Sequence, residues 1–361
     1  MEGDHWPHGV CDDAGRSLAR LRKRASEFFE NLSVADLARE AHRHLWVSDW
    51  LRIADDYRIF AESVREDDSV QIAREAWLCS LTAFEVARRL SCPSDLASTD
   101  LAGKIDVGLT GFEDDAGPAI ERVEIDGFDQ GALSGLFLPA FRHGGSSAPA
   151  VICVGDEEVT MGATMSRLLP VSLCRNMSLL LVNTCNSSVP RRFKLEHVLQ
   201  CWVDYLEARP DVDSRRIAVH GEGTGAGHAS RLALGDRRIA AAVCDGGLLK
   251  SATRRASLRW MTGLEQTVHE GSSAGSLLPS RRIPCPLLVV PGRRSMVREQ
   301  DALELQAGYR QAGADCSIVV PNRIPSPLGE VENFIAVDNF VFEWLDSKLG
   351  AARQLDAVVY L

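Results

Sequence analysis

A glycine-rich turn in the middle of the chain carries several side chains that could act as acids, bases or hydrogen-bond donors. The segment Ile217–His228 reads as a short apolar strand, a turn with three glycines and the start of a helix. Backbone amides at the start of a helix favour a negative oxygen, so the amide of Thr224 could stabilise an oxyanion. Glu222 or His228 could then move a proton, although His228 could equally be a packed helix residue. These three residues are our catalytic candidates.

Other polar residues follow the apolar runs that we interpret as neighbouring strands. The ends of parallel strands meet at one edge of a sheet, and ligands bind at that edge. The expected substrate-binding residues are Gly223, Asp156, Glu157, Asn183, Cys185 and Asp245. Capping of a strand end is the alternative role for Asp245. Cys185 has no base beside it in the sequence, which argues against a nucleophilic role.

Two kinds of segment must position these residues. The first part of the chain, to about residue 115, has helical spacing of apolar residues, with helices over Asp13–Leu32 and Val70–Leu90 and a cap at Ser33. Residues 93–118 are rich in Pro, Gly, Asp and Ser, and we interpret them as a linker. A helical region over residues 1–115 is therefore expected to precede a second domain over residues 120–350.

The second domain alternates short apolar runs with helical stretches. Val123–Ile125 and Leu133–Leu138 flank a turn and predict a hairpin. The strands predicted after it are Ala148–Val154, Leu179–Val182, Ile217–Val219, Ala240–Cys244, Leu287–Val290 and Ile318–Val320. Helices are predicted over about 162–174, 194–208, 225–234, 300–312 and 331–348. This alternation is typical of an α/β fold with a mostly parallel sheet and helices on both faces. The interruption at about 249–282 is expected to form a helical cap over the site.

The turn corresponds to the G-x-S-x-G elbow of α/β-hydrolases, in which a strained turn lifts a serine above the sheet. The segment Ala208–Glu222, the order of the elements and the run Asp245-Gly246-Gly247 carry this resemblance. The chain is similar to the branch of that superfamily with the FrsA-type esterases and 2,6-dihydroxypseudooxynicotine hydrolase, over about residues 40–350. The resemblance implies a homodimer and a helical N-terminal region that contributes to the cap.

The chain departs from this family at all three positions of its catalytic triad. Gly223 stands at the serine position, and Arg293 and Arg294 stand where the acid is expected. The last histidine of the chain is His269, too early to be the base. Without a nucleophile and a base, hydrolysis through an acyl-serine is not expected, whereas hydrolysis of a C–C bond by a directly activated water stays an alternative. We therefore expect a non-hydrolytic enzyme that acts on a small oxygenated, ketide-like or aromatic metabolite, by cyclisation, C–C bond formation or cleavage, or rearrangement.

Two other functions fit the same residues. The chain could be a catalytically inactive binding or regulatory protein with a hydrolase fold. Gly221, Gly223 and Ala226 also match the relaxed dinucleotide fingerprint, with Asp245 in the position that would bind a ribose hydroxyl. The fingerprint normally follows the first strand of its sheet, whereas two parallel strands are predicted before this turn.

The composition of the chain limits the classes of molecule that it is expected to bind. The formal net charge is -10, which argues against nucleic acid as the main ligand. The chain has no apolar run long enough to cross a membrane and no secretion signal, so we expect a cytoplasmic protein. Its ten cysteines form no C-x-x-C pair, and ligand spacing implies neither a metal nor a cofactor.

Overall fold

The chain divides into two compact units, Met1–Gly117 and Pro118–Leu361, and each is described here by itself. The predicted cap at 249–282 lies outside the described residues, as do Glu157, Asn183 and Cys185. So do Arg293 and Arg294. The computed structural model describes residues 16–64, 70–91, 96–116, 120–126, 132–140, 147–156, 159–182, 195–245, 283–291, 299–321, 323–326 and 329–358.

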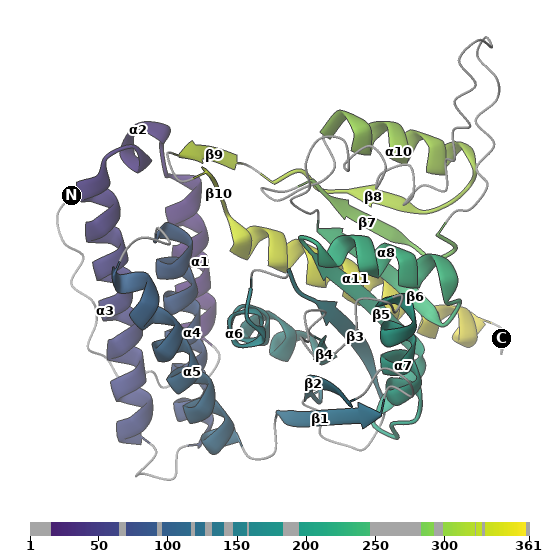
Figure 1. Cartoon of the computed structure of the whole chain (residues 1–361), viewed down its shortest axis with the longest axis horizontal. Coiled ribbons are helices and arrows are strands. Elements are labelled where there is room, and N and C mark those ends of the chain that lie inside the picture. The colour runs from purple at the N-terminus through teal and green to yellow at the C-terminus, as the bar shows by residue number, and fades with distance from the viewer. Residues whose placement is uncertain are drawn as a thin grey trace. The chain divides into compact units, whose positions relative to one another are not determined.

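The first unit consists of helices (Figure 1). They are α1 (Arg16–Glu30), α2 (Val34–Leu37), α3 (Glu40–Val64), α4 (Val70–Leu90) and α5 (Leu96–Ala116). The prediction of α4 is confirmed, and the apolar stripe that predicted it is buried, with Trp77, Leu81 and Phe84 at its centre. Ser33 caps α2 as expected, because its side chain accepts a hydrogen bond from the backbone N–H of Asp36.

The prediction of a linker at residues 93–118 is wrong, because α5 occupies most of that range. Leu101, Ile105 and Phe112 recur at helical spacing and are buried. The glycines that suggested a linker let α5 approach α4 closely. A β-carbon on Gly111 would lie 2.3 Å from a ring atom of Trp77. The indole N–H of Trp77 in turn donates to Asp115 at 2.6 Å, so one tryptophan fixes the register of the two helices.

Two glycines of α5 should respond oppositely to the same substitution. Gly111→Ala is expected to destabilise the protein by about 1–3 kcal/mol, because its methyl group must displace Trp77. Gly103→Ala meets nothing within 4 Å and should stabilise it by about 0.5–1 kcal/mol through helix propensity. Urea unfolding of the two variants measures both effects. A stabilised Gly111→Ala protein would contradict the close packing of α4 and α5.

The second unit is built on an eight-stranded sheet in the order β1-β2-β4-β3-β5-β6-β7-β8. Strands β1 and β2 form the predicted antiparallel hairpin, β2 pairs with β4 in antiparallel fashion, and the remaining pairs are parallel. The strands are β1 (Glu121–Asp126), β2 (Ala132–Leu138), β3 (Ala148–Val154), β4 (Ser178–Val182), β5 (Val212–Glu222), β6 (Ile239–Asp245), β7 (Leu287–Val290) and β8 (Cys316–Ile318). The predicted mostly parallel α/β sheet is confirmed.

Helices cover both faces of this sheet (Figure 1). Ile217 and Val219 of β5 pack in one apolar core with Trp202 of α7. His220, which points to the opposite face, contacts Phe342 of α11. The helices are α6 (Met161–Ser172), α7 (Leu195–Glu207), α8 (Gly225–Gly235), α10 (Glu299–Gln311) and α11 (Phe334–Val358), and a short 3₁₀ turn covers Leu173–Arg175.

The region after β8 differs from the prediction. The strand predicted at Ile318–Val320 ends at Ile318. A separate two-stranded hairpin follows, formed by β9 (Arg323–Ser326) and β10 (Gly329–Glu332), and α11 begins only at Phe334. Apolar periodicity alone does not distinguish a short strand from the first turn of a helix, so the sequence pattern predicts a helix from residue 331, although residues 331–332 belong to β10.

Candidate active site

The glycine turn joins the central strand β5 to the helix α8, at the carboxyl edge of the sheet. Gly223 has φ of 60°, a left-handed conformation that a residue with a side chain adopts only with strain. A β-carbon on Gly221 would lie 2.3 Å from the carbonyl oxygen of Gly225, and one on Gly225 would lie 2.2 Å from that of Val154. The close packing of strand and helix therefore requires the flanking glycines.

The carboxylate of Asp156 fills the space beside Gly223. A β-carbon on Gly223 would lie 2.4 Å from both Cγ and Oδ2 of Asp156, so no side chain fits there while Asp156 keeps this position. The hydroxyl of Thr224 donates to Oδ1 of Asp156 at 3.1 Å. Asp156 follows β3 and is buried, with 4% of its surface exposed. If residue 223 were the serine of a G-x-S-x-G elbow, its side chain would begin in the space that this carboxylate occupies.

A buried cluster of charges is centred on Arg167 of α6 and includes Glu222, which directly precedes Gly223. The Arg167 guanidinium donates to both carboxylate oxygens of Asp338 on α11, at 2.6 to 3.1 Å. It also donates to Glu222 and lies 3.9 Å from the Asp245 carboxylate. One cation thus joins two helices to the ends of β5 and β6. Neither Arg167 nor Asp338 is among the predicted site residues, although in both cases a charged residue within an apolar helical stretch signals a buried ion pair.

Arg167 also limits what Glu222 can do. The Arg167 guanidinium donates to a carboxylate oxygen of Glu222, and that hydrogen bond uses part of the acceptor capacity that a catalytic base would need. Glu222 therefore has the contacts of a residue that holds the end of β5 in place.

The two histidines near the turn are both neutral at pH 7. Burial lowers the pKa of His228 to about 4, with a smaller contribution from Arg231. Burial also lowers the pKa of His220 to about 4, against the opposing effect of Glu222. Among the described residues, His228 Nδ1 and His220 Nε2 have no hydrogen-bond partner, so neither atom is paired with a hydroxyl or thiol nucleophile.

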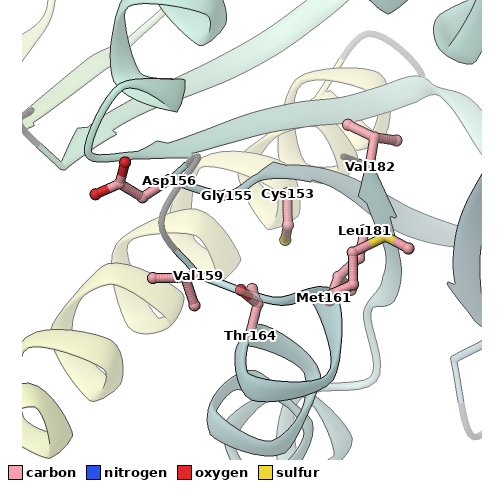
Figure 2. Close-up of a pocket in the computed structure, with 8 residues that line it drawn as sticks. All are labelled: Cys153, Gly155, Asp156, Val159, Met161, Thr164, Leu181 and Val182. Atoms are coloured by element: carbon pink, nitrogen blue, oxygen red, sulfur yellow. The ribbon is translucent and has the colours of Figure 1, made fainter. Parts of the chain in front are cut away.

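A small cavity adjoins Asp156, between β3, β4 and α6 (Figure 2). The side chains of Cys153 and Thr164 point into it, whereas the Asp156 carboxylate is turned away from the Cys153 sulfur. Burial, and then the charge of Glu222, raises the pKa of the Cys153 thiol, so this thiol is not a nucleophile. The volume of this cavity that the centre of a water molecule can occupy is about 10 Å³, which is enough for one water.

The geometry of the glycine turn also argues against a dinucleotide site. The three glycines of the turn are explained by packing and by the backbone conformation of Gly223. The Asp156 carboxylate lies beside the start of α8, where it would repel a pyrophosphate. The glycine pattern is therefore not evidence for a bound dinucleotide.

Among residues whose placement is described, no group of three or more His, Cys, Asp or Glu side chains could hold a metal ion. Within the same part of the chain, no helix is both long and apolar enough to span a bilayer.

Comparison with known proteins shows what the fold is. No protein-family model and no curated protein matches the sequence. A solved structure of 2,6-dihydroxy-pseudo-oxynicotine hydrolase matches with a TM-score of 0.56 and 18% identity, over 91% of this chain and 96% of that one. The AtxE2 isopeptidase matches with a TM-score of 0.47 and 18% identity, over 66% of this chain and 42% of that one.

At this identity the first match supports the fold alone, and the second adds no argument. The strand order, the turn between β5 and α8, and the match over nearly the whole length of both chains agree. The chain therefore has the α/β-hydrolase fold.

Proposed function

We propose that this protein is an enzyme that performs acid–base chemistry at the hydrolase elbow without a serine nucleophile. Its substrate would be a small oxygenated metabolite, ketide-like or aromatic, and its reaction a cyclisation, a C–C bond formation or cleavage, or a rearrangement through an enolate. The observation that carries the proposal is the Asp156 carboxylate, which lies 2.4 Å from where a β-carbon of residue 223 would be.

The proposal assigns proton transfer to Asp156 rather than to Glu222 or His228. Glu222 is bound to Arg167, and His228 Nδ1 has no hydrogen-bond partner among the described residues, so no described group orients this imidazole as a base. Asp156 lies at the carboxyl edge of the sheet, beside the Thr224 hydroxyl and the start of α8. A carboxylate in this place can take a proton from a carbon next to a carbonyl and return it to another atom of the same substrate. The helix start would favour the negative oxygen that forms in between.

The experiment compares Asp156→Asn with the wild-type protein. Purified protein is incubated with a panel of small ketones, 1,3-dicarbonyl compounds and phenols, and conversion is followed by mass spectrometry. Asparagine keeps the size of aspartate and an acceptor for Thr224 but cannot take up the proton, so turnover should fall on the order of 100-fold. Asp204→Asn is the matched control, because Asp204 is exposed on α7 and should leave turnover unchanged.

Two results would count against the proposal. Full turnover by Asp156→Asn would remove Asp156 from the chemistry, and ester hydrolysis by the wild-type protein would replace the proposed reaction class. A second candidate, a binding or regulatory protein, is favoured by one observation: Asp156 fills the elbow, and the described cavity beside it has room for about one water. Ligands that raise the melting temperature but are never converted would support that candidate.

A further inference from the structure

The carboxylates around Arg167 do not share its charge equally. Arg167 makes three hydrogen bonds to Asp338 and one to Glu222, whereas its nearest approach to Asp245 is 3.9 Å. Among the described residues, Arg167 is the cation that lies within ion-pair distance of the Asp245 carboxylate. We propose that Asp245 keeps its proton in the folded protein at neutral pH and is therefore an O–H donor at the carboxyl edge of the sheet.

The register of the strands places Asp245 against another carboxylate. Glu222 and Asp245 are partners in the parallel pair β5–β6, so their side chains leave the same face of the sheet from backbones about 4.8 Å apart. Two buried carboxylates at that spacing repel each other when both are ionised. Arg167 offsets the charge of Glu222, which it contacts directly, so the proton goes to Asp245.

The other groups around Asp245 that the structure describes do not supply a second positive charge. His220 of β5 is buried and neutral, and its unpartnered Nε2 lies in the electrostatic reach of Glu222, Arg167 and Asp338. The negative charges of Glu332 on β10 and Asp338 on α11 also repel an ionised Asp245. Burial, followed by the charges of Glu332 and Glu222, raises the pKa of Asp245 well above its ordinary value. Geometry and electrostatics thus agree.

A protonated Asp245 gives the site a carboxylic acid O–H donor, whereas the sequence alone suggests an ionised carboxylate at this position. Its backbone carbonyl accepts a hydrogen bond from the Gly223 N–H at 2.9 Å, so the acid is attached directly to the turn. A carboxylic acid kept neutral by its surroundings can donate a hydrogen bond to a substrate oxygen, which an ionised aspartate cannot do. This inference does not depend on the proposed reaction, because the protonation state exists without any substrate.

Infrared spectroscopy tests the inference directly. Wild-type protein with ¹³C-labelled aspartate carboxyl groups should show, at pH 7, the carbonyl stretch of a protonated acid, shifted by the label. The label separates aspartate from glutamate without any substitution. Asp245→Asn should lose this band, and Asp204→Asn, which alters an exposed aspartate, should keep it. Absence of a labelled protonated band in the wild type, or its persistence in Asp245→Asn, would overturn the inference.

The pH dependence of unfolding gives a second, independent test. A carboxyl whose pKa is raised by folding contributes stability below its unfolded pKa of about 4, and that contribution is lost as the pH rises toward the folded pKa. Asp245→Asn removes this dependence. The unfolding constant of the wild type, divided by that of Asp245→Asn, should therefore rise by up to about tenfold per pH unit above pH 5. A ratio that stays flat or falls between pH 5 and 8 would show that Asp245 is ionised.

Discussion

Gly223→Ser is expected to destabilise the protein by about 2–5 kcal/mol and to create no esterase activity. Two costs add. A residue with a side chain at φ of 60° is strained by about 1–2 kcal/mol, and its β-carbon would lie 2.4 Å from the Asp156 carboxyl group. The new hydroxyl would lie beside the Asp156 carboxylate rather than a histidine, and a carboxylate is too weak a base to activate a serine hydroxyl efficiently. Urea unfolding and the cleavage of p-nitrophenyl esters measure the two effects.

The design has a matched control and an internal rescue. Gly235→Ala, at the other end of α8, meets nothing within 4 Å and should change stability by less than about 1 kcal/mol. Asp156→Gly removes the clashing carboxylate, so the double variant should recover the part of the loss that is due to contact but not the backbone strain. Rapid ester turnover by Gly223→Ser would reveal a base that the present site assignment lacks.

Arg167→Met is expected to destabilise the protein by about 3–5 kcal/mol. Methionine replaces the apolar stem of arginine but leaves Asp338 and Glu222 without the cation that both contact. Buried carboxylates that lose their partner cost far more than an intact pair contributes. Urea unfolding of the second unit, followed at pH 7, gives the magnitude.

A more exposed ion pair is the control that distinguishes the effect of burial from the effect of losing a charge. Lys348 on α11 lies 2.6 Å from Asp315, and the side chains are 28% and 44% exposed. Lys348→Met should therefore cost less than about 1 kcal/mol. Pairing Arg167→Met with Asp338→Leu should recover part of the loss, because one stranded charge is removed. Equal effects of Arg167→Met and Lys348→Met would mean that the Arg167 cluster is solvated.

The sequence by itself determined the class of fold and the identity of the elbow residue. Apolar runs separated by helical spacing led to the sheet and its covering helices, since burial on both faces of a strand leaves a local pattern. The glycines at 221, 223 and 225 located the turn between β5 and α8, because closely spaced glycines mark a tight turn even where the contacts that require them, to Asp156 and Val154, are distant in the chain. The same local reading failed at α5, because Gly108, Gly111 and Asp115 pack against α4 rather than forming a flexible connection.

Only the tertiary structure decided which side chains meet at the turn. Asp156 contacts Thr224 across 68 positions of the chain, and Arg167 contacts Asp338 across 171. Local patterns are silent on such pairs, because the order of strands in the sheet brings them together and the sequence does not display that order. The position of the Asp156 carboxylate beside Gly223, and the unequal sharing of the Arg167 charge, both depend on that order.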